Sequence, residues 1–436
     1  MQILWIVFLT VFIVGCSPKS SVEVKVQKKG VSDLFSVPQD VRQYSSELDE
    51  NLTKVSQSEF EKQYFSVWNS PTTLGDKDSV QWAFNTFKFG KSYAENLQLH
   101  NQEFFDEMKS NSNFENYLTL NKRALTLKEL NIRAFPTDRP LLRDPQKAGE
   151  GFPFDYLQNS AIHANKPLLA THYSKDKAWV HIFSSFAYGW VKVNEIVFLE
   201  KKYTDLWQKA EQILITKENE PIYSSSGEFL FKSKIGMMFA LIDEDESEYT
   251  VLTVSSYKNR QPLFLKSKIS KRSAHKGILL LSTKNINIIV DEMMKSNYGW
   301  GGMYGQRDCS STLRDLYTPF GIWLPRNSYQ QSKVGDVLSL EGLSDEEKIA
   351  TIKEKAIPFK TLLYKKGHIV LYVGIFNDEI IVFQNTWGIR TKENGVEGRF
   401  IIGKTIFSTL SIGENLKEYD AEAGLLKNLK SMNTLL

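Results

Sequence analysis

The stretch YGWGGMYGQRDCSSTLRDLYTPFG, residues 298–321, decides how the C-terminal part of this chain folds and where it can carry chemistry. A glycine-rich turn leads into Asp308-Cys309-Ser310-Ser311. Apolar residues then recur at helical spacing and end at a glycine: Leu313, Leu316, Tyr317, Phe320 and Gly321. This pattern predicts a helix over about 310–320 with Cys309 at its start. Because the amides and the dipole at a helix N-terminus favour a thiolate and can hold an oxyanion, Cys309 is a candidate nucleophile.

The segments on either side of this stretch supply the partners that a thiol nucleophile needs. A helix is expected over about 284–295, and the strands HIVLYVGIF (368–376) and EIIVFQ (379–384) form a hairpin through Asn377-Asp378. His368 opens the first strand and is the candidate general base. A third polar group should fix the tautomer of the imidazole. Gln384, which ends the facing strand, is the natural candidate, with Asn385 as its neighbour.

Composition argues against a disordered chain, a nucleic-acid-binding protein and a metalloprotein. The 436 residues are 42% hydrophobic, 24% charged and 12% aromatic, which is ordinary for globular domains and suggests two to four folding units. The net charge of +3, from 54 basic and 51 acidic residues, is too balanced to indicate nucleic acid as a partner. The six histidines and two cysteines form no CxxC or HExxH motif, so we expect neither a metal nor an organic cofactor.

The N-terminus carries an export signal. Residues 3–14 form an apolar run, shorter than the roughly 20 residues of a membrane-spanning helix but typical of a signal peptide. Gly15-Cys16-Ser17 follows at once and resembles the bacterial lipoprotein processing box, which implies lipidation of Cys16 and exposure to the periplasm or cell wall. The segment before the run, Met1-Gln2, departs from the pattern because it lacks Lys and Arg. An uncleaved anchor or a misassigned start are the alternatives, and both still place the rest of the chain outside the cytoplasm.

If Cys16 is lipidated, Cys309 has no disulfide partner in the chain. A lone cysteine is most often a buried inert thiol, but an exported protein needs a reason to keep one, and a cysteine with a histidine elsewhere is a candidate nucleophile. The sequence around Cys309 therefore favours a catalytic thiol over an inert one.

The spacing of apolar and turn residues divides the chain into a signal peptide, a lipidated cysteine with its tether, a helical N-terminal domain, two small all-β barrels and an α+β catalytic domain. Helical spacing of Phe60, Tyr64, Val67 and Trp68, and of Phe104, Phe105 and Met108, indicates core packing in the helical domain. Short apolar runs between turn residues predict the barrels. The boundaries are 1–15, 16–45, 46–125, 126–200, 201–270 and 271–436.

Both barrels resemble bacterial SH3-like modules, the first more specifically through Gly189-Trp190-Val191 after the strand that carries Trp179. The motifs YGWGG, RDCSS, LPRNS, GHIVLYVG and FQNTWGIR, in this order, resemble the NlpC-type bacterial cell-wall cysteine endopeptidases, whose fold is papain-like. The resemblance is close over about 280–405, and the preceding helical segment and barrels match a multidomain branch of that family. The implied fold class is α+β multidomain: a papain-like cysteine peptidase domain preceded by two small all-β SH3-like barrels and a helical N-terminal domain.

The resemblance also assigns roles to individual residues. It implies that Cys309 is the nucleophile and His368 the general base, with Gln384 at the position where relatives usually have a second histidine. It further implies that Asp308 receives the free amine of the peptide substrate and that Tyr298 lies beside the nucleophile. Other residues expected to line the pocket are Arg326, Ser328 and, from the first barrel, Tyr188.

Together these features predict a monomeric, membrane-anchored lipoprotein that hydrolyses peptidoglycan stem peptides or muropeptides. The resemblance implies cleavage between γ-D-glutamate and the following diamino acid, in fragments with a free L-alanine amine. Two alternatives remain open. One is a catalytically degenerate wall-binding lipoprotein, which the glutamine at position 384, in place of the usual histidine, leaves possible. The other is an amidase or acyltransferase that uses the same thiol.

Overall fold

The computed structural model describes residues 30–48, 55–69, 75–257 and 260–435. The predicted signal peptide and the predicted lipidation site, Cys16, lie outside the described residues. Residues from Val31 onward pack into one unit, and all contacts below lie within it. In the part of the chain that is described, no helix is both long and apolar enough to cross a membrane.

The N-terminal region is built from short helices. The α-helices are α1 (Asp33–Ser36), α2 (Gln57–Tyr64), α3 (Ser66–Asn69), α4 (Trp82–Thr86) and α5 (Gln102–Asn111), and the 3-10 helices are η1 (Val41–Gln43), η2 (Ser45–Glu47), η4 (Ser79–Gln81) and η5 (Phe114–Asn116). The aromatic residues that predicted helices are buried on α2, α3 and α5. The predicted core packing of this region is therefore confirmed.

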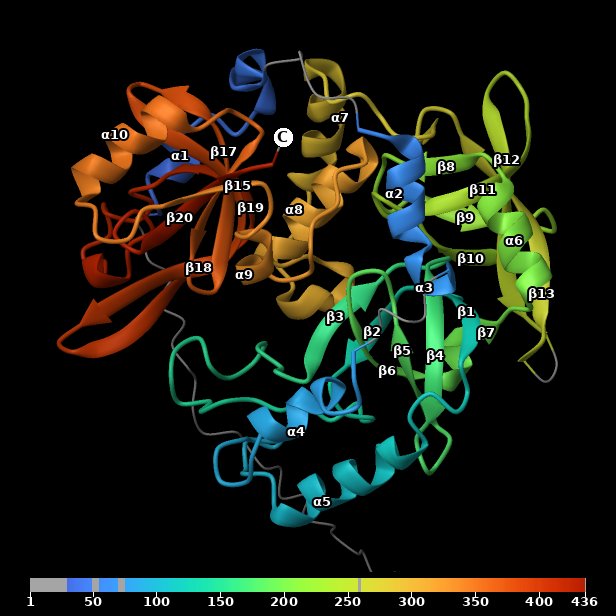
Figure 1. The fold of residues 1–436 in the computed structure, drawn as a ribbon. Coiled ribbons are helices and arrows are strands. Elements are labelled where there is room, and N and C mark those ends of the chain that lie inside the picture. The colour runs from blue at the N-terminus through green and yellow to red at the C-terminus, as the bar shows by residue number, and fades with distance from the viewer. Residues whose placement is uncertain (1–29, 49–54, 70–74, 258–259, 436) are drawn as a thin grey trace, which may run out of the picture. The chain divides into compact units, whose positions relative to one another are not determined.

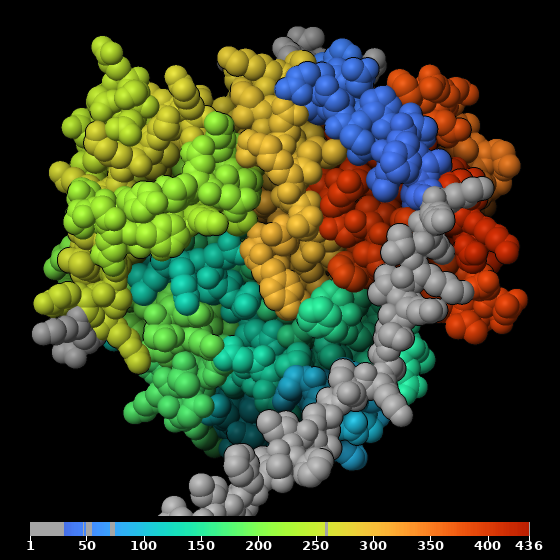
Figure 2. Space-filling view, turned by 180° about the vertical axis from the view of Figure 1, so that it is seen from behind, coloured from blue at the N-terminus to red at the C-terminus, as the bar shows by residue number. Residues whose placement is uncertain are grey.

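The segment from residue 31 to 45 differs from the predicted tether. Val31, Val37, Val41 and Tyr44 are buried, and the last three belong to the hydrophobic core of the C-terminal domain. Asp33 also accepts hydrogen bonds from the backbone N–H and hydroxyl of Thr409, both 2.8 Å. Figure 2 shows the blue N-terminal segment lying against the orange and red surface of that domain. The sequence predicted a polar tether here, but the apolar residues of this segment pack on partners that lie far away in the sequence.

The first barrel is an antiparallel sheet with strand order β3-β2-β6-β5-β4-β1-β7. Its strands are β1 (Lys122–Thr126), β2 (Leu130–Arg133), β3 (Gln158–Ile162), β4 (Pro167–Tyr173), β5 (Trp179–Phe183), β6 (Tyr188–Lys192) and β7 (Ile196–Phe198), with η6 (Val193–Glu195) before the last strand. Trp190 and Val191, which led to the prediction of this barrel, are buried on β6.

The second barrel follows helix α6 (Lys201–Lys209) and has a sheet with strand order β13-β12-β11-β8-β14 and a hairpin of β9 and β10. Its strands are β8 (Gln212–Ile215), β9 (Pro221–Tyr223), β10 (Phe229–Lys232), β11 (Met238–Glu244), β12 (Glu248–Ser256), β13 (Pro262–Ser270) and β14 (Ala274–Lys276). Because β14 pairs with β8, the barrel extends a few residues beyond the predicted boundary at 270.

The C-terminal domain packs helices against an antiparallel sheet with strand order β15-β20-β16-β17-β18-β19 (Figure 1). Its strands are β15 (Asp336–Ser339), β16 (Thr361–Lys365), β17 (His368–Phe376), β18 (Glu379–Glu393), β19 (Val396–Thr409) and β20 (Leu429–Thr434). Its helices are α7 (Thr283–Met293), η8 (Trp300–Gly305), α8 (Cys309–Tyr317), η9 (Thr318–Phe320), α9 (Ser328–Gln331), α10 (Asp345–Lys355) and η10 (Ala421–Ala423).

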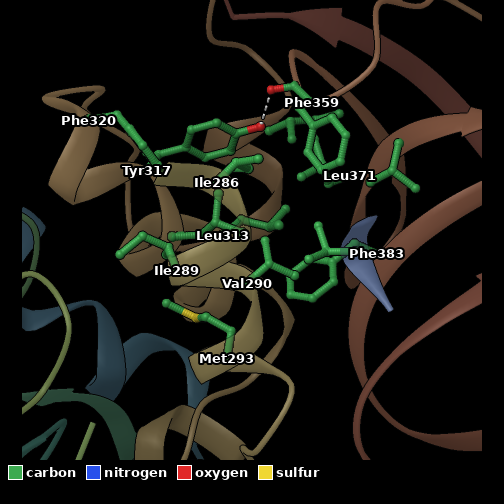
Figure 3. Close-up of a cluster of buried hydrophobic side chains, with 14 of the residues drawn as sticks. Ile286, Ile289, Val290, Met293, Leu313, Tyr317, Phe320, Phe359, Leu371 and Phe383 are labelled. Carbon is green, nitrogen blue, oxygen red and sulfur yellow. Dashed lines mark hydrogen bonds between the residues drawn. The ribbon is translucent and has the colours of Figure 1, made fainter. Parts of the chain in front are cut away.

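A buried apolar cluster fixes α8 against the sheet. Side chains from α7 and α8 pack on Leu371 of β17 and Phe383 of β18 (Figure 3). The Tyr317 hydroxyl, at the end of α8, donates to the carbonyl of Phe359 at 2.9 Å. Burial of each large apolar side chain is worth about 1.5–3 kcal/mol, so this cluster holds the start of α8 in place relative to both strands.

Candidate active site

Cys309 is the first residue of α8, as the sequence predicts. Asp308 caps the helix: its carboxylate accepts from the Ser311 backbone N–H at 2.8 Å, while the Ser311 hydroxyl accepts from the Asp308 N–H at 2.9 Å. This reciprocal capping box determines where the helix begins. The Cys309 side chain then lies at the helix N-terminus with only 8% of the residue exposed.

The thiol of Cys309 is neutral in this resting site. Burial, followed by the charge of Asp308, raises its pKa to about 12, although the backbone N–H groups of Ile369 and Ser310 oppose the shift. The sequence suggested a thiolate held by the helix N-terminus. That expectation omitted two opposing effects, which are the loss of solvent around the sulfur and the capping carboxylate next to it.

His368 begins β17 and lies beside this thiol, because the N–H of the next residue, Ile369, reaches the sulfur. The imidazole is half-buried, and the loss of solvent around it lowers its pKa to about 4 despite a hydrogen bond to Gln384 that favours the charged form. A neutral imidazole is the form that can accept a proton, so at neutral pH the site holds a neutral thiol and a neutral base.

Gln384 and Ser408 together determine the tautomer of His368. The Gln384 Nε2 group donates to the Ser408 hydroxyl oxygen at 2.6 Å, and that hydroxyl donates to the Thr409 carbonyl at 3.0 Å. The amide oxygen of Gln384 therefore faces His368, whose Nε2 lies 2.7 Å from it. Since an amide oxygen only accepts, Nε2 carries the proton and Nδ1 keeps the lone pair.

Asn385 does not contact His368. Successive side chains of a strand point to opposite faces, and Asn385 donates instead to the Arg307 carbonyl at 2.9 Å and to the Thr312 hydroxyl at 3.2 Å. Of the two candidates for the third member, the geometry therefore favours Gln384.

Asp308 and Arg326 form a buried ion pair next to the thiol. Arg326 Nη2 lies 2.7 Å from Asp308 Oδ2, and Arg326 also donates to the Ser160 hydroxyl of the first barrel at 2.7 Å. Burial opposes ionisation of Asp308, but Arg326 and the Ser311 N–H hold the pKa of its carboxyl below the usual value. The first barrel thus contributes a polar group to the surroundings of Cys309.

The other predicted pocket residues lie in different places. Tyr298 lines a cavity beside His368, and burial followed by the nearby Cys309 raises the pKa of its phenol well above the usual value. Ser328 begins α9 and is half-buried. Tyr188 does not line this cavity: its ring stacks on Phe183 and its hydroxyl is 3.5 Å from the Ser79 carbonyl oxygen.

Two glycines of the YGWGG motif allow the loop to approach the first barrel closely. Gly301 and Gly302 have φ of 60° and 86°, a region that side chains disfavour. A Cβ on Gly301 would lie 2.7 Å from the Gln158 carbonyl oxygen, and one on Gly302 would lie 2.6 Å from the Ala161 Cβ. The neighbouring Trp300 donates its indole N–H to the Asp155 carbonyl at 2.9 Å. The loop that precedes Cys309 therefore packs closely against β3.

A buried ion network fixes α8 and the residue before its cap to both barrels. Arg307 contacts Glu218 of the second barrel at 2.8 Å and Asp315 of α8 at 2.6 Å. His163 of the first barrel lies 3.2 Å from the same Asp315, and Lys234 lies 3.3 Å from Glu218. Arg307 belongs to the RDCSS motif and Asp315 to the predicted helix. Their partners His163, Glu218 and Lys234 lie outside every motif that was singled out in the sequence.

The cavity beside His368 has a volume of about 480 Å³. The aromatic side chains in its lining include Tyr298, Trp300, Trp387 and Phe154. Among the described residues, no group of three or more His, Cys, Asp or Glu side chains is placed to hold a metal ion.

A thiol at a helix N-terminus, an imidazole on the strand β17 and an amide that orients the imidazole are the groups that a cysteine peptidase uses. Comparison with protein families agrees. Residues 295–402 match the NlpC/P60 family, and residues 5–117 match the NLPC_P60 stabilising domain found at the N-terminus. Residues 140–192 match an SH3 domain of SH3b1 type, and 201–246 match an SH3 domain of SH3b2 type.

The chain therefore carries an NlpC/P60 domain together with the N-terminal stabilising domain and two SH3 domains, and NlpC/P60 is a family of cysteine peptidases. This confirms the family resemblance and the fold class drawn from the sequence. Lipidation of Cys16 stays a prediction.

Solved structures of similar fold include an NlpC/P60 endopeptidase from Photobacterium damselae subsp. piscicida. It is 23% identical, with a TM-score of 0.78, over 92% of this chain and 97% of that one. An NlpC/P60 family protein from Bacillus cereus ATCC 10987 is 15% identical, with a TM-score of 0.49, over 72% of this chain and 99% of that one. No curated protein sequence matches the chain.

Proposed function

We propose that this protein is an exported, lipid-anchored cysteine endopeptidase that hydrolyses peptidoglycan stem peptides. The bond cleaved is the one between γ-D-glutamate and the following diamino acid, in fragments whose L-alanine amine is free. The observation that carries the proposal is the placement of the Cys309 thiol beside His368, with Gln384 bonded to the imidazole, inside an NlpC/P60 domain.

The chemistry follows from the protonation states of the resting site. Nδ1 of His368 accepts the Cys309 proton as the sulfur attacks the γ-carbonyl carbon, and the N–H groups at the start of α8 stabilise the oxyanion. The imidazolium then gives that proton to the leaving amine, which departs and leaves a thioester. Water attacks the thioester, loses a proton to His368, and the thiol is restored as the acid is released.

Asp308 is the group proposed to bind the substrate amine. Its Oδ1 is occupied by Ser310, Ser311 and Arg326, whereas among the described residues Oδ2 accepts a hydrogen bond from Arg326 alone. A carboxylate oxygen can accept a second hydrogen bond, so an ammonium group can join Arg326 at Oδ2. An acylated amine carries no charge and would bind there less well.

Defined peptides test the proposal. The protein is incubated with L-Ala-γ-D-Glu-diamino acid tripeptides and their N-acetylated counterparts, and mass spectrometry follows the release of L-Ala-D-Glu. We expect release from the free peptides, a large loss on N-acetylation, and no release by the Cys309→Ala variant. Cleavage at another bond, or equal cleavage of the acetylated peptides, would refute the assignment.

The anchor is tested separately. Cys16→Ser should leave a soluble or unprocessed protein that takes up no labelled lipid. Normal lipid labelling of this variant would refute lipidation at Cys16.

A non-catalytic wall-binding protein is the second candidate, and the burial of the thiol favours it. A Cys309 pKa of about 12 suits an inert thiol as well as a resting nucleophile. The two differ in the presence of substrate, because only a nucleophile forms a thioester with the bound peptide.

A further inference from the structure

A second, smaller cavity lies where helix α2, the two barrels and helix α8 meet. Its volume is about 10 Å³, close to the space that one water-sized sphere occupies. We call it the junction cavity. Its lining includes Tyr64 of α2, Lys166 and Phe186 of the first barrel, Met237 of the second barrel, and Arg314 and Asp315 of α8.

Lys166 places a buried ammonium group at this cavity. The residue is only 6% exposed, and among the described residues its Nζ has neither a carboxylate nor a hydrogen-bond partner. Its neighbours are aromatic: Nζ lies 3.2 Å from the centre of the Tyr64 ring and 5.8 Å from that of Phe186. Burial, followed by repulsion from Arg314, lowers the pKa of Lys166 well below its usual value. Contacts with ring faces therefore offset only part of the cost of removing this ammonium from water.

Arg314 brings a second buried cation to the same cavity. Its Nη2 lies 2.7 Å from Asp315 Oδ1, whereas its Nε–H finds no acceptor among the described residues. The guanidinium lies over the ring of Phe186, with Cζ 3.8 Å from the ring centre. Arg314 and Lys166 thus approach one ring and line one cavity, and each has an N–H donor to spare.

Asp315 is the carboxylate of the lining, and both of its oxygens are already engaged. Oδ1 accepts from Arg314, and Oδ2 lies 2.6 Å from Arg307 Nε and 3.2 Å from His163 Nε2. The lining therefore holds two cations and one carboxylate, which it shares with Arg307. One monovalent anion would balance the charge that Asp315 leaves uncompensated.

We propose that Lys166 and Arg314 bind a monatomic anion, chloride, in the junction cavity, and that this ion fastens α8 to the two barrels. The ion would accept charge-assisted hydrogen bonds from the ammonium group and from the Arg314 Nε–H. A cavity with room for one water-sized sphere is too small for a phosphate or sulfate ion. The site is separate from the cavity beside His368, and its occupation does not depend on the proposed function.

Bromide, which replaces chloride and scatters X-rays anomalously, tests the site directly. Crystals of the wild-type protein are grown in sodium bromide, and an anomalous difference map is calculated from data collected at the bromine absorption edge. We expect a peak within hydrogen-bond distance of Lys166 Nζ and Arg314 Nε, and no peak in crystals of Lys166→Met. A wild-type map without a peak in the junction cavity would overturn the proposal, and this arm needs no variant that folds.

Thermal unfolding of the full chain shows whether the ion binds in solution. Chloride is titrated at pH 7 against gluconate at constant ionic strength, and we expect a saturable rise in Tm of about 2–5 °C. Lys166→Met should abolish the rise. The matched control Lys122→Met removes an exposed lysine of the first barrel that lies 5.5 Å from the centre of the Phe198 ring, and it should keep the rise. A rise that does not saturate, or that Lys166→Met retains, is a general salt effect and would overturn the proposal.

Discussion

Removing the hydroxyl of Ser408 tests how His368 is held in its catalytic tautomer. Ser408 accepts from the Gln384 amide nitrogen at 2.6 Å, which turns the amide oxygen toward His368. Without this acceptor the amide can rotate by 180°. Its NH₂ group then faces the imidazole and favours the tautomer that is protonated on Nδ1, which cannot take the thiol proton.

The size of the effect follows from one hydrogen bond. A neutral hydrogen bond contributes about 0.5–1.5 kcal/mol, and each 1.4 kcal/mol is a factor of ten in a population or a rate. Ser408→Ala should therefore lower kcat by up to about tenfold. Removing the orienting group itself, in Gln384→Ala, should cost about 10²–10⁴-fold.

A double-mutant cycle separates orientation from simple loss of packing. A carboxylate presents an oxygen to His368 whichever way it is turned, so Ser408→Ala should have little effect on kcat in the Gln384→Glu background. The assay is release of L-Ala-D-Glu at saturating peptide, with thermal unfolding as the control for folding. An equal loss in both backgrounds would refute the orienting role of Ser408, and an unchanged rate in Gln384→Ala would place the third member elsewhere.

Three further predictions concern the thiol, the ion network and the glycine loop. Because the pKa of Cys309 is raised to about 12, the free protein should react with iodoacetamide at pH 8 about a thousandfold more slowly than the denatured chain, and rapid alkylation at pH 7 would contradict the neutral thiol. Burial opposes ionisation of Glu218, yet Arg307 and Lys234 hold its pKa at about 2, below the 4.5 of an unperturbed glutamate. Its contribution of about 3 kcal/mol to the free energy of unfolding is therefore present above pH 4.5 and is lost as the pH falls through 2. Glu218→Gln should destabilise the protein at pH 7 by about 3–5 kcal/mol and flatten that pH dependence in chemical denaturation, and an unchanged pH profile would refute it. Gly302→Ala should lower both thermal stability and kcat, because its Cβ would lie 2.6 Å from the Ala161 Cβ, whereas Gly342→Ala, at a left-handed glycine with open space around it, should lower stability slightly and leave kcat unchanged.

Local patterns in the sequence were sufficient to locate the centre of the site. The helix that starts at Cys309 and the hairpin from His368 to Gln384 are both encoded within a few residues, by a capping aspartate, a glycine stop and two continuous apolar strands. The contact between His368 and Gln384 follows from the hairpin register, because both side chains lie on one face of adjacent strands. These elements could be predicted since their causes are local.

The rest of the site depends on contacts between distant segments. Ser408 orients Gln384 from the neighbouring strand β19, and no motif marks it. The neutral state of Cys309 likewise arises from burial by several segments. Burial and long-range pairing are properties of the folded chain, so a single sequence gives them no local signature.

Acid quenching during turnover of the L-Ala-γ-D-Glu-diaminopimelate peptide, followed by peptide mapping in a mass spectrometer, tests the role of Cys309 most directly. We expect an acid-stable thioester: the proteolytic fragment that contains Cys309 gains the mass of an L-Ala-γ-D-Glu acyl group, and hydroxylamine removes it. Two results together would contradict the role of Cys309 as the nucleophile: a Cys309-containing fragment that stays unmodified at every quench time during turnover, and a turnover rate that Cys309→Ala leaves undiminished.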